Sequence, residues 1–253
     1  MYAQERHRLI VERARLDGRV EVNALATELA VTTETVRRDL TVLERHGLLR
    51  RVHGGAIPVE RLSFEPGLAA RDAAMTDEKE RIAKAALAEL PDGGSVILDA
   101  GTTTVRLAGL LPSDLELTVV TNALTIAALL SVRGNVTVHL VGGRVRGVTQ
   151  ATVGEWGRGP LEQVHVDVAF IGTNGVTVER GLTTPDITEA EAKQAMIKAA
   201  RHVVVLADHT KLGSDHFARF GGLDEVDVLI TDSGADPELT EAVQAAGPRV
   251  VRA

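Results

Sequence analysis

Residues 22–40 read VNALATELAVTTETVRRDL, and this stretch determines how the N-terminal part of the chain folds. Its apolar residues recur at the spacing of two short helices. A tight turn at Ala30-Val31 separates the two helices, and Thr32 or Thr33 can cap the second. The side chains expected to face inward are Val22, Leu25, Ala26, Leu29, Val36, Leu40 and Leu43. A further amphipathic helix is expected over 3–16, ended by Asp17-Gly18.

The second helix of this pair turns hydroxyl and guanidinium groups outward. In a helix-turn-helix the amino end of such a helix enters the major groove, where Thr and Arg reach base edges and phosphates. Residues 48–56 read LLRRVHGGA and predict a hairpin wing that grips the backbone. The DNA contacts expected are Thr32, Thr33, Thr35, Arg37, Arg38, Arg50, Arg51 and His53. The alternative is a plain three-helix bundle whose arginines are solvated surface.

Charge is spread unevenly along the 253 residues. Residues 1–57 contain ten Arg and eight Asp or Glu, which gives a net charge of +2. Residues 58–253 carry a net charge of −9, so the whole chain carries −7. A basic head on an acidic body suits a head that meets a polyanion and a body with another task. Six aromatic residues are too few for single-strand binding by base stacking.

Several classes of protein are excluded by composition. The absence of cysteine removes disulfides, thiol catalysis and Cys-based zinc sites. The eight His lack the spacing of a metal site, so no metal is expected. No apolar run reaches the length of a membrane span, and the charged residues 1–8 do not read as a signal peptide. We therefore expect a cytoplasmic protein.

The chain divides into three parts by pattern. We expect a head over 1–57, a linker over 58–75 that contains two Pro and a Gly, and a body over 76–253. In the body, apolar strands are expected at 95–98, 117–120, 136–141, 166–171, 203–207 and 228–231. Helices are expected at 78–90, 104–111, 123–130 and 189–200. This alternation predicts a largely parallel sheet covered on both faces.

Polar residues follow the carboxyl end of each expected strand, which is where ligands bind in such sheets. Gly101 and the three Thr after it open a helix and could cradle a phosphate. The other strand ends carry the segments 121–122, 142–144, 172–175 and 207–211. Their convergence predicts a small, anionic, hydroxylated ligand. Some of these residues also have a purely structural interpretation. Residues 99–101 and 173–175 could be turns, Glu189 could lie on a solvated helix face, and His209 could be part of the loop structure.

Both parts resemble one known family. Residues 22–40 and 43–56 resemble the signature of the DeoR family of bacterial transcription regulators. Residues 99–104, 121–122, 142–143, 172–175, 181–184, 189–193 and 207–211 resemble that family's C-terminal sensor domain. The resemblance implies an α/β protein: an N-terminal winged helix-turn-helix followed by a larger α/β domain similar to ribose-5-phosphate isomerase and glucosamine-6-phosphate deaminase.

The resemblance also implies a repressor released from operator DNA by a phosphosugar, with no resident cofactor. Fructose 1-phosphate is one candidate, because many members of the family control fructose operons. The residues expected at the effector are Asp99, Gly101, Thr102, Thr103, Thr104, Asn122, Gly143, Arg144, Asn174, Glu191, Lys193 and Lys211. The alternative is a sugar-phosphate isomerase, although such an enzyme has no need of the head. One small head contacts few bases, so at least a dimer is expected.

Overall fold

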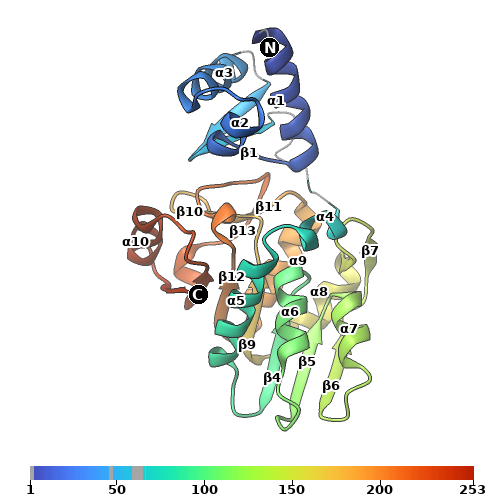
Figure 1. Ribbon diagram of the computed structural model, residues 1–253. Coiled ribbons are helices and arrows are strands. Elements are labelled where there is room, and N and C mark those ends of the chain that lie inside the picture. The colour runs from blue at the N-terminus through green and yellow to red at the C-terminus, as the bar shows by residue number, and fades with distance from the viewer. Residues whose placement is uncertain (1–2, 46–47, 59–64, 66) are drawn as a thin grey trace. The chain divides into compact units, whose positions relative to one another are not determined.

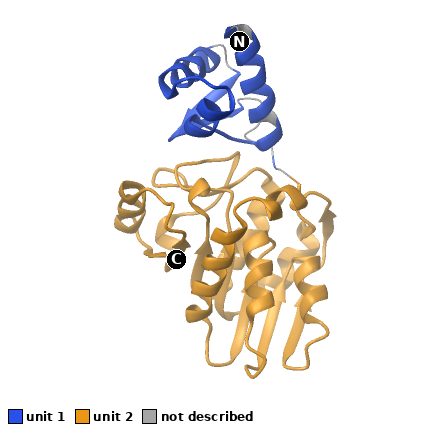
Figure 2. Cartoon of the chain, in the orientation of Figure 1, with its two compact units in different colours: residues 1–66 blue, residues 67–253 orange. Residues whose placement is uncertain are grey.

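The computed structural model describes residues 3–45, 48–58, 65 and 67–253. The chain forms two compact units, residues 1–66 and 67–253 (Figure 2). Within the described residues, no helix combines the length and the apolar character needed to cross a bilayer.

The N-terminal unit is a winged helix-turn-helix. Its helices are α1 (Ala3–Asp17), α2 (Val22–Glu28) and α3 (Thr33–Arg45), and its strands are β1 (Val20–Glu21), β2 (Leu49–Val52) and β3 (Gly55–Pro58). The strands form an antiparallel sheet in the order β1-β3-β2. The β2–β3 hairpin is the wing expected from residues 48–56.

The turn between α2 and α3 is built by local hydrogen bonds. Ala30 adopts a left-handed conformation with φ +52°, and the Val31 N–H donates to the carbonyl of Ala26 at 3.0 Å. The hydroxyl of Thr32 accepts from the backbone N–H of Thr35 at 3.2 Å, so Thr32 caps α3. The inward-facing side chains expected on α3 are all buried in the core of this unit.

The C-terminal unit is a seven-stranded parallel sheet between two layers of helices (Figure 1). The strand order is β15-β14-β12-β9-β4-β5-β6. The strands are β4 (Gly94–Leu98), β5 (Leu117–Thr121), β6 (Val136–Leu140), β9 (Val166–Gly172), β12 (Ala200–Leu206), β14 (Val228–Thr231) and β15 (Arg249–Arg252). This confirms the parallel α/β fold expected from the alternating pattern.

Two apolar cores lie on the two faces of that sheet. Helices α5 (Thr76–Ala86), α6 (Thr102–Leu110) and α7 (Leu124–Leu130) cover one face, and α8 (Glu155–Glu162), α9 (Ile187–Lys198) and α10 (Pro237–Ala245) cover the other. In β4, Val96 and Leu98 join the first core and Ile97 joins the second. Side chains alternate in this way because successive residues of a strand point to opposite faces.

Several short elements were not expected from the sequence. A hairpin joins β7 (Arg144–Arg146) to β8 (Ala151–Val153), and a small antiparallel sheet contains β10 (Gly175–Thr177), β11 (Gly181–Thr184) and β13 (Ala218–Gly221). A helix, α4 (Leu68–Ala73), lies within the expected linker 58–75. Strands of three or four residues carry too little periodicity to be recognised, and their partners are distant in sequence.

The sheet has a topological switch point between β4 and β9. From β4 the chain adds β5 and β6 in one direction, and later adds β9, β12, β14 and β15 in the other. The loops after β4 and β9 therefore leave in opposite directions and open a crevice, where ligands of such sheets bind.

Candidate nucleic-acid interface and anion site

The eight residues expected to contact DNA all lie in the N-terminal unit, on α3 and its cap or on the wing. Arg37 and Arg38 are exposed in the first turns of α3. Arg37 lies 3.8 Å from Glu34, a solvent-exposed pair that contributes little stability and leaves the guanidinium available to a phosphate. Thr33 and Thr35 are half-buried beside them.

The wing is held against α3 by one arginine. The backbone N–H of Arg51 donates to the Glu44 carboxylate at 2.8 Å, and its guanidinium donates to the hydroxyl of Thr41 at 3.0 Å. On the neighbouring turn, Arg19 donates to the carbonyl of His53 at 2.9 Å. Hydrogen bonds therefore connect the wing that carries Arg50 and Arg51 to the helix that carries Arg37 and Arg38.

A buried ion pair that the sequence analysis missed orients α3. Asp39 is 5% exposed and accepts hydrogen bonds from the Arg6 guanidinium and from His7 Nε2, the latter at 2.9 Å. Burial works to raise the pKa of Asp39, but the hydrogen bonds from Arg6 and His7 outweigh it and hold the pKa below its ordinary value. This contact ties α1 to the helix that carries Arg37 and Arg38.

In the C-terminal unit, a buried ion pair connects the ends of β4 and β9 at the switch point. The Lys193 ammonium on α9 contacts the Asp99 carboxylate after β4 and donates to the Gly172 carbonyl at 2.9 Å. Asp99 also accepts from the Gly172 N–H at 2.9 Å, and the Phe220 ring lies 5.6 Å from the ammonium. Burial raises the pKa of Asp99 more than the neighbouring Lys193 lowers it.

The first turn of α6 lies beside that pair, directly after β4. Thr102, Thr103 and Thr104 are all buried, and the Thr104 hydroxyl donates to the Gly101 carbonyl at 2.9 Å. The unpaired N–H groups of a first helical turn attract anions. The residues expected to form the cradle thus lie at the switch point.

Lys211 ends the 3-10 turn His209–Lys211 that follows β12. Its positive charge acts on the buried carboxylate of Asp208. Burial works to raise the pKa of Asp208, but the Lys211 ammonium, the hydrogen bond from Thr210 and the charge of Lys79 together hold that pKa below its ordinary value. His209 contacts Asp232 instead, with Nδ1 2.8 Å from the carboxylate. His209 therefore has a structural partner, in line with the interpretation as loop structure.

Two of the expected effector residues, Asn122 and Asn174, make hydrogen bonds at the rim of the sheet, which is the edge formed by the carboxyl ends of its parallel strands, and a third, Gly143, lies close to β8. The Asn122 side-chain oxygen accepts from the Ala100 N–H at 3.0 Å, and the Asn174 side-chain oxygen accepts from the Thr184 hydroxyl at 3.0 Å. Gly143 has φ +139°, and a Cβ there would lie 2.5 Å from the Val153 carbonyl oxygen. A side chain is therefore sterically excluded where Gly143 crosses β8.

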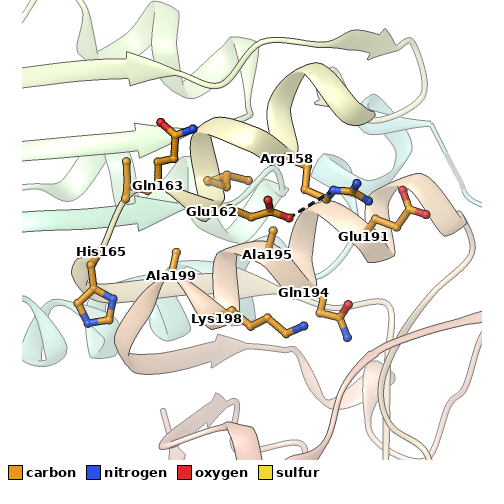
Figure 3. Close-up of a pocket in the computed structure, with 11 residues that line it drawn as sticks. Arg158, Glu162, Gln163, His165, Glu191, Gln194, Ala195, Lys198 and Ala199 are labelled. Carbon is orange, nitrogen blue, oxygen red and sulfur yellow. Dashed lines mark ion pairs between the residues drawn. The ribbon is translucent and has the colours of Figure 1, made fainter.

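Glu191 and Arg144 do not join the other expected residues at the rim. Successive residues turn about 100° around a helix, so Glu191 lies about 200° from Glu189. It is exposed and lines a separate pocket of about 450 Å³ between α8 and α9 (Figure 3). There Arg158 and Glu162 form an ion pair at 3.4 Å. Arg144 is exposed at the start of β7.

Glu189 occupies the buried position that the sequence analysis treated as a solvated face. It is 5% exposed, contacts the Arg146 guanidinium, and accepts from the Thr149 hydroxyl at 2.5 Å. Glu189 and Lys193 stand four residues apart and so share one face of α9. That spacing could have identified Glu189, whereas nothing local to Arg146 indicated a partner 43 residues away.

Two further cations near the cradle were not expected. Arg106 on α6 donates to the Thr102 carbonyl at 2.9 Å and to the Asp72 carboxylate at 2.6 Å. Lys79 on α5 is 5% exposed and donates to the carbonyls of Arg71 and Ala74. The pKa of Lys79 is lowered to about 8, chiefly by burial. The Asp208 carboxylate works to raise this pKa, whereas the positive charges of Lys211, Arg106 and Arg71 lower it further. Together with Lys211, these side chains form a cation cluster beside α6.

Matches to known proteins extend over nearly the whole chain. The family described as DeoR-like helix-turn-helix domain matches residues 6–61, and the family described as DeoR C terminal sensor domain matches residues 74–233. The HTH-type transcriptional regulator GlpR of Haloferax volcanii is 40% identical over 99% of this chain and 98% of that protein. The glycerol-3-phosphate regulon repressor of Escherichia coli is 32% identical over 92% of each chain. A ribose 5-phosphate isomerase from Methanocaldococcus jannaschii has 19% identity and a TM-score of 0.41 over 55% of each chain.

Proposed function

The chain belongs to the DeoR family of transcriptional regulators, and on this premise we propose that it represses an operon of sugar or sugar-phosphate metabolism. A phosphorylated sugar bound at the switch point of the C-terminal unit would lower its affinity for operator DNA. The proposal is carried by one observation: the first turn of α6, the Asp99–Lys193 pair and a cluster of cations meet at that crevice.

The DNA-binding half rests on α3 and the wing. Arg37 and Arg38 project from the amino-terminal turns of α3, the part of a recognition helix that reaches base edges and phosphates. Arg50 and Arg51 on β2 extend the same positive surface toward the backbone. Neutralising several phosphates in this way makes affinity strongly dependent on salt.

The effector half rests on complementary chemistry. The N–H groups of residues 102–104 and the ammonium of Lys211 suit a phosphate, and the Asp99–Lys193 pair offers both an acceptor and a donor to sugar hydroxyls. The name of the Escherichia coli relative refers to glycerol 3-phosphate, which is also a small phosphorylated polyol. The effector of this chain is therefore sought among such compounds, fructose 1-phosphate included.

The buried carboxylates of the crevice argue against the isomerase alternative. An aldose–ketose isomerase needs a carboxylate that is available as a general base. Asp99 is engaged by Lys193 and by the Gly172 N–H, and Glu189 by Arg146 and Thr149. Both carboxylates are held in ion pairs, which favours a binding role.

Operator recognition also requires more than one copy of the chain. A single recognition helix reads only a few base pairs, and two heads on a symmetric operator multiply that affinity. We therefore propose that the repressor acts as a dimer or a higher assembly.

The test is an anisotropy titration of the full chain on the DNA upstream of its own gene, repeated with a panel of sugar phosphates. The proposal expects specific binding that one compound weakens. Binding that no compound alters would remove the effector class and keep the regulator, and absence of specific binding at low salt would overturn the DNA-binding role.

Two variants, each with a control, test where the DNA interface and the effector site lie. Arg38→Ala should weaken operator binding and reduce the slope of log affinity against log salt by about one. Arg13→Ala serves as its control, because Arg13 lies on α1 and pairs with Asp17. Lys211→Gln should weaken the response to the sugar phosphate, whereas Lys198→Gln on the exposed side of α9 should not. An unchanged salt slope for Arg38→Ala would move the interface elsewhere.

A further inference from the structure

Helix α4 is attached to the C-terminal unit chiefly by polar contacts. It spans Leu68–Ala73, follows directly on the boundary between the two units, and contains no buried residue. Its first N–H donates to the carbonyl of Val148 at 3.0 Å. Its carboxyl end is held by Arg106, which reaches Asp72, and by Lys79, which donates to the carbonyls of Arg71 and Ala74.

The two cations that hold α4 stand beside the anion cradle. Arg106 lies on α6 and donates to the carbonyl of Thr102, the first residue of that helix, at 2.9 Å. Lys79 lies in the first turn of α5, which packs along α6, and is close enough to Asp208 and Lys211 for their charges to act on it. The same two side chains therefore hold α4 and lie near the cradle region, Arg106 through the Thr102 carbonyl and Lys79 through its proximity to Arg106 and Lys211.

The cradle itself is covered. Helix α4 packs against α6, and the exposed fractions of Thr102, Thr103 and Thr104 are 6%, 8% and 0%. A phosphate that binds the N–H groups of this turn brings a charge of nearly −2 beside Arg106 and Lys79. A phosphate dianion is a stronger partner for these cations than a peptide carbonyl or the half-exposed carboxylate of Asp72.

We propose that Lys79 and Arg106 are shared between α4 and the phosphate of the effector, so that phosphate binding withdraws both cations from α4 and releases it. This rests on the proposed effector class and assigns its route of regulation. The release is energetically accessible because α4 buries no apolar side chain. Helix α4 begins directly after the boundary with the DNA-binding unit, so its release would free the stretch of chain next to that boundary.

Competition for one cation predicts opposite signs for two variants. Asp72→Asn weakens the hold on α4 and leaves the cation free, so it should tighten phosphate binding by about two- to fivefold. Arg106→Gln removes the shared cation, so it should weaken phosphate binding by about tenfold. A purely structural role would make both variants neutral or both harmful. The matched controls are Asp77→Asn and Arg81→Gln, two exposed residues of α5.

The experiment uses the full chain and three probes: inorganic phosphate, glycerol 3-phosphate and fructose 1-phosphate. Calorimetry gives the dissociation constants, and amide hydrogen exchange follows the peptide that contains residues 67–75. We expect faster exchange in that peptide when a probe binds the wild-type chain, and already faster exchange in Asp72→Asn without a probe. The controls should stay within about twofold of the wild type.

The outcomes separate this inference from the function it rests on. If a probe binds and exchange in 67–75 slows or stays the same, or if Asp72→Asn binds no tighter than the wild type, the sharing of cations is wrong while the effector proposal stands. If the wild-type chain binds none of the probes, the effector proposal fails and the inference fails with it.

Discussion

Replacing Lys193 by methionine should leave the Asp99 carboxylate buried without its cation and destabilise the C-terminal unit. Methionine matches the length of the lysine stem, so packing against Phe220 is largely retained and the loss is chiefly electrostatic. Asp99 is 1% exposed, and its remaining partner at the carboxylate is the Gly172 N–H at 2.9 Å.

The magnitude follows from burial. Breaking a buried ion pair by removing one partner costs about 3–5 kcal/mol, because the remaining charge stays desolvated. Asp99 can lower this cost by taking a proton, since burial already raises its pKa in the intact protein. Between the ordinary carboxyl pKa of about 3.9 and the raised one, the folded state then binds more protons than the unfolded state. The deficit of the variant should therefore shrink as the pH falls through the raised pKa of Asp99 toward the ordinary carboxyl value.

The assay is urea unfolding at several pH values, followed by circular dichroism. Hydrogen exchange of β4 and β9 isolates the C-terminal unit, because a chain of two units need not unfold in one transition. Lys198→Met is the control, since Lys198 is exposed on the same helix and its loss should change stability by less than about 0.5 kcal/mol. Adding Asp99→Asn to Lys193→Met should recover at least about 1 kcal/mol.

The reasoning is refuted if Lys193→Met costs less than about 1 kcal/mol at the highest pH of the series, where the Asp99 carboxylate carries most charge. It is also refuted if the double variant is no more stable than Lys193→Met alone. Either result would mean that the Asp99 carboxylate does not depend on the ammonium.

Three other perturbations test the remaining features. Asp39→Asn should destabilise the N-terminal unit by about 2–3 kcal/mol, seen as faster hydrogen exchange in α1 and α3, because it removes the negative charge and one of the two acceptor oxygens that Arg6 and His7 share. Gly143→Ala should cost more than about 1 kcal/mol, since its Cβ would strike the Val153 carbonyl, whereas Gly142→Ala, with open space around it, should be nearly neutral in urea unfolding. The stability of the wild-type chain should rise as pH increases from 8 toward 10.5, because the folded-state pKa of Lys79 lies near 8 and the unfolded ammonium keeps its proton longer; in Lys79→Met this part of the slope should vanish.

The winged helix-turn-helix could be predicted in detail from residues 22–56. Its signals are local: apolar residues at helical spacing, a threonine that caps the second helix, and a Gly-Gly turn in the wing. Six of the seven parallel strands in the body were equally accessible, because strands buried on both faces are continuous apolar runs, whereas β15, α8, α10 and the short antiparallel strands were not expected. The cradle at Gly101 to Thr104 followed from the same logic, since a strand end and a helix start adjoin in the chain.

The partners across the crevice could not be read from the chain. Glu189 and Lys193 share a face of α9 that the sequence could show, but which carboxylate of 189 and 191 is buried depends on where the helix packs against β8 and β9. No local pattern singled out Arg146, Arg106 or Lys79, since their partners lie on other elements or within the expected linker 58–75.

Local spacing thus determined most of the longer helices and strands, the two-part organisation and the position of the Gly101 to Thr104 segment that we propose as a phosphate cradle. Tertiary structure alone decided which charges are paired and which are exposed. The physical reason is that an ion pair is selected by desolvation: once packing removes a charged group from water, it must meet an opposite charge or a polar group, and that partner is set by the arrangement of the sheet rather than by its distance along the chain.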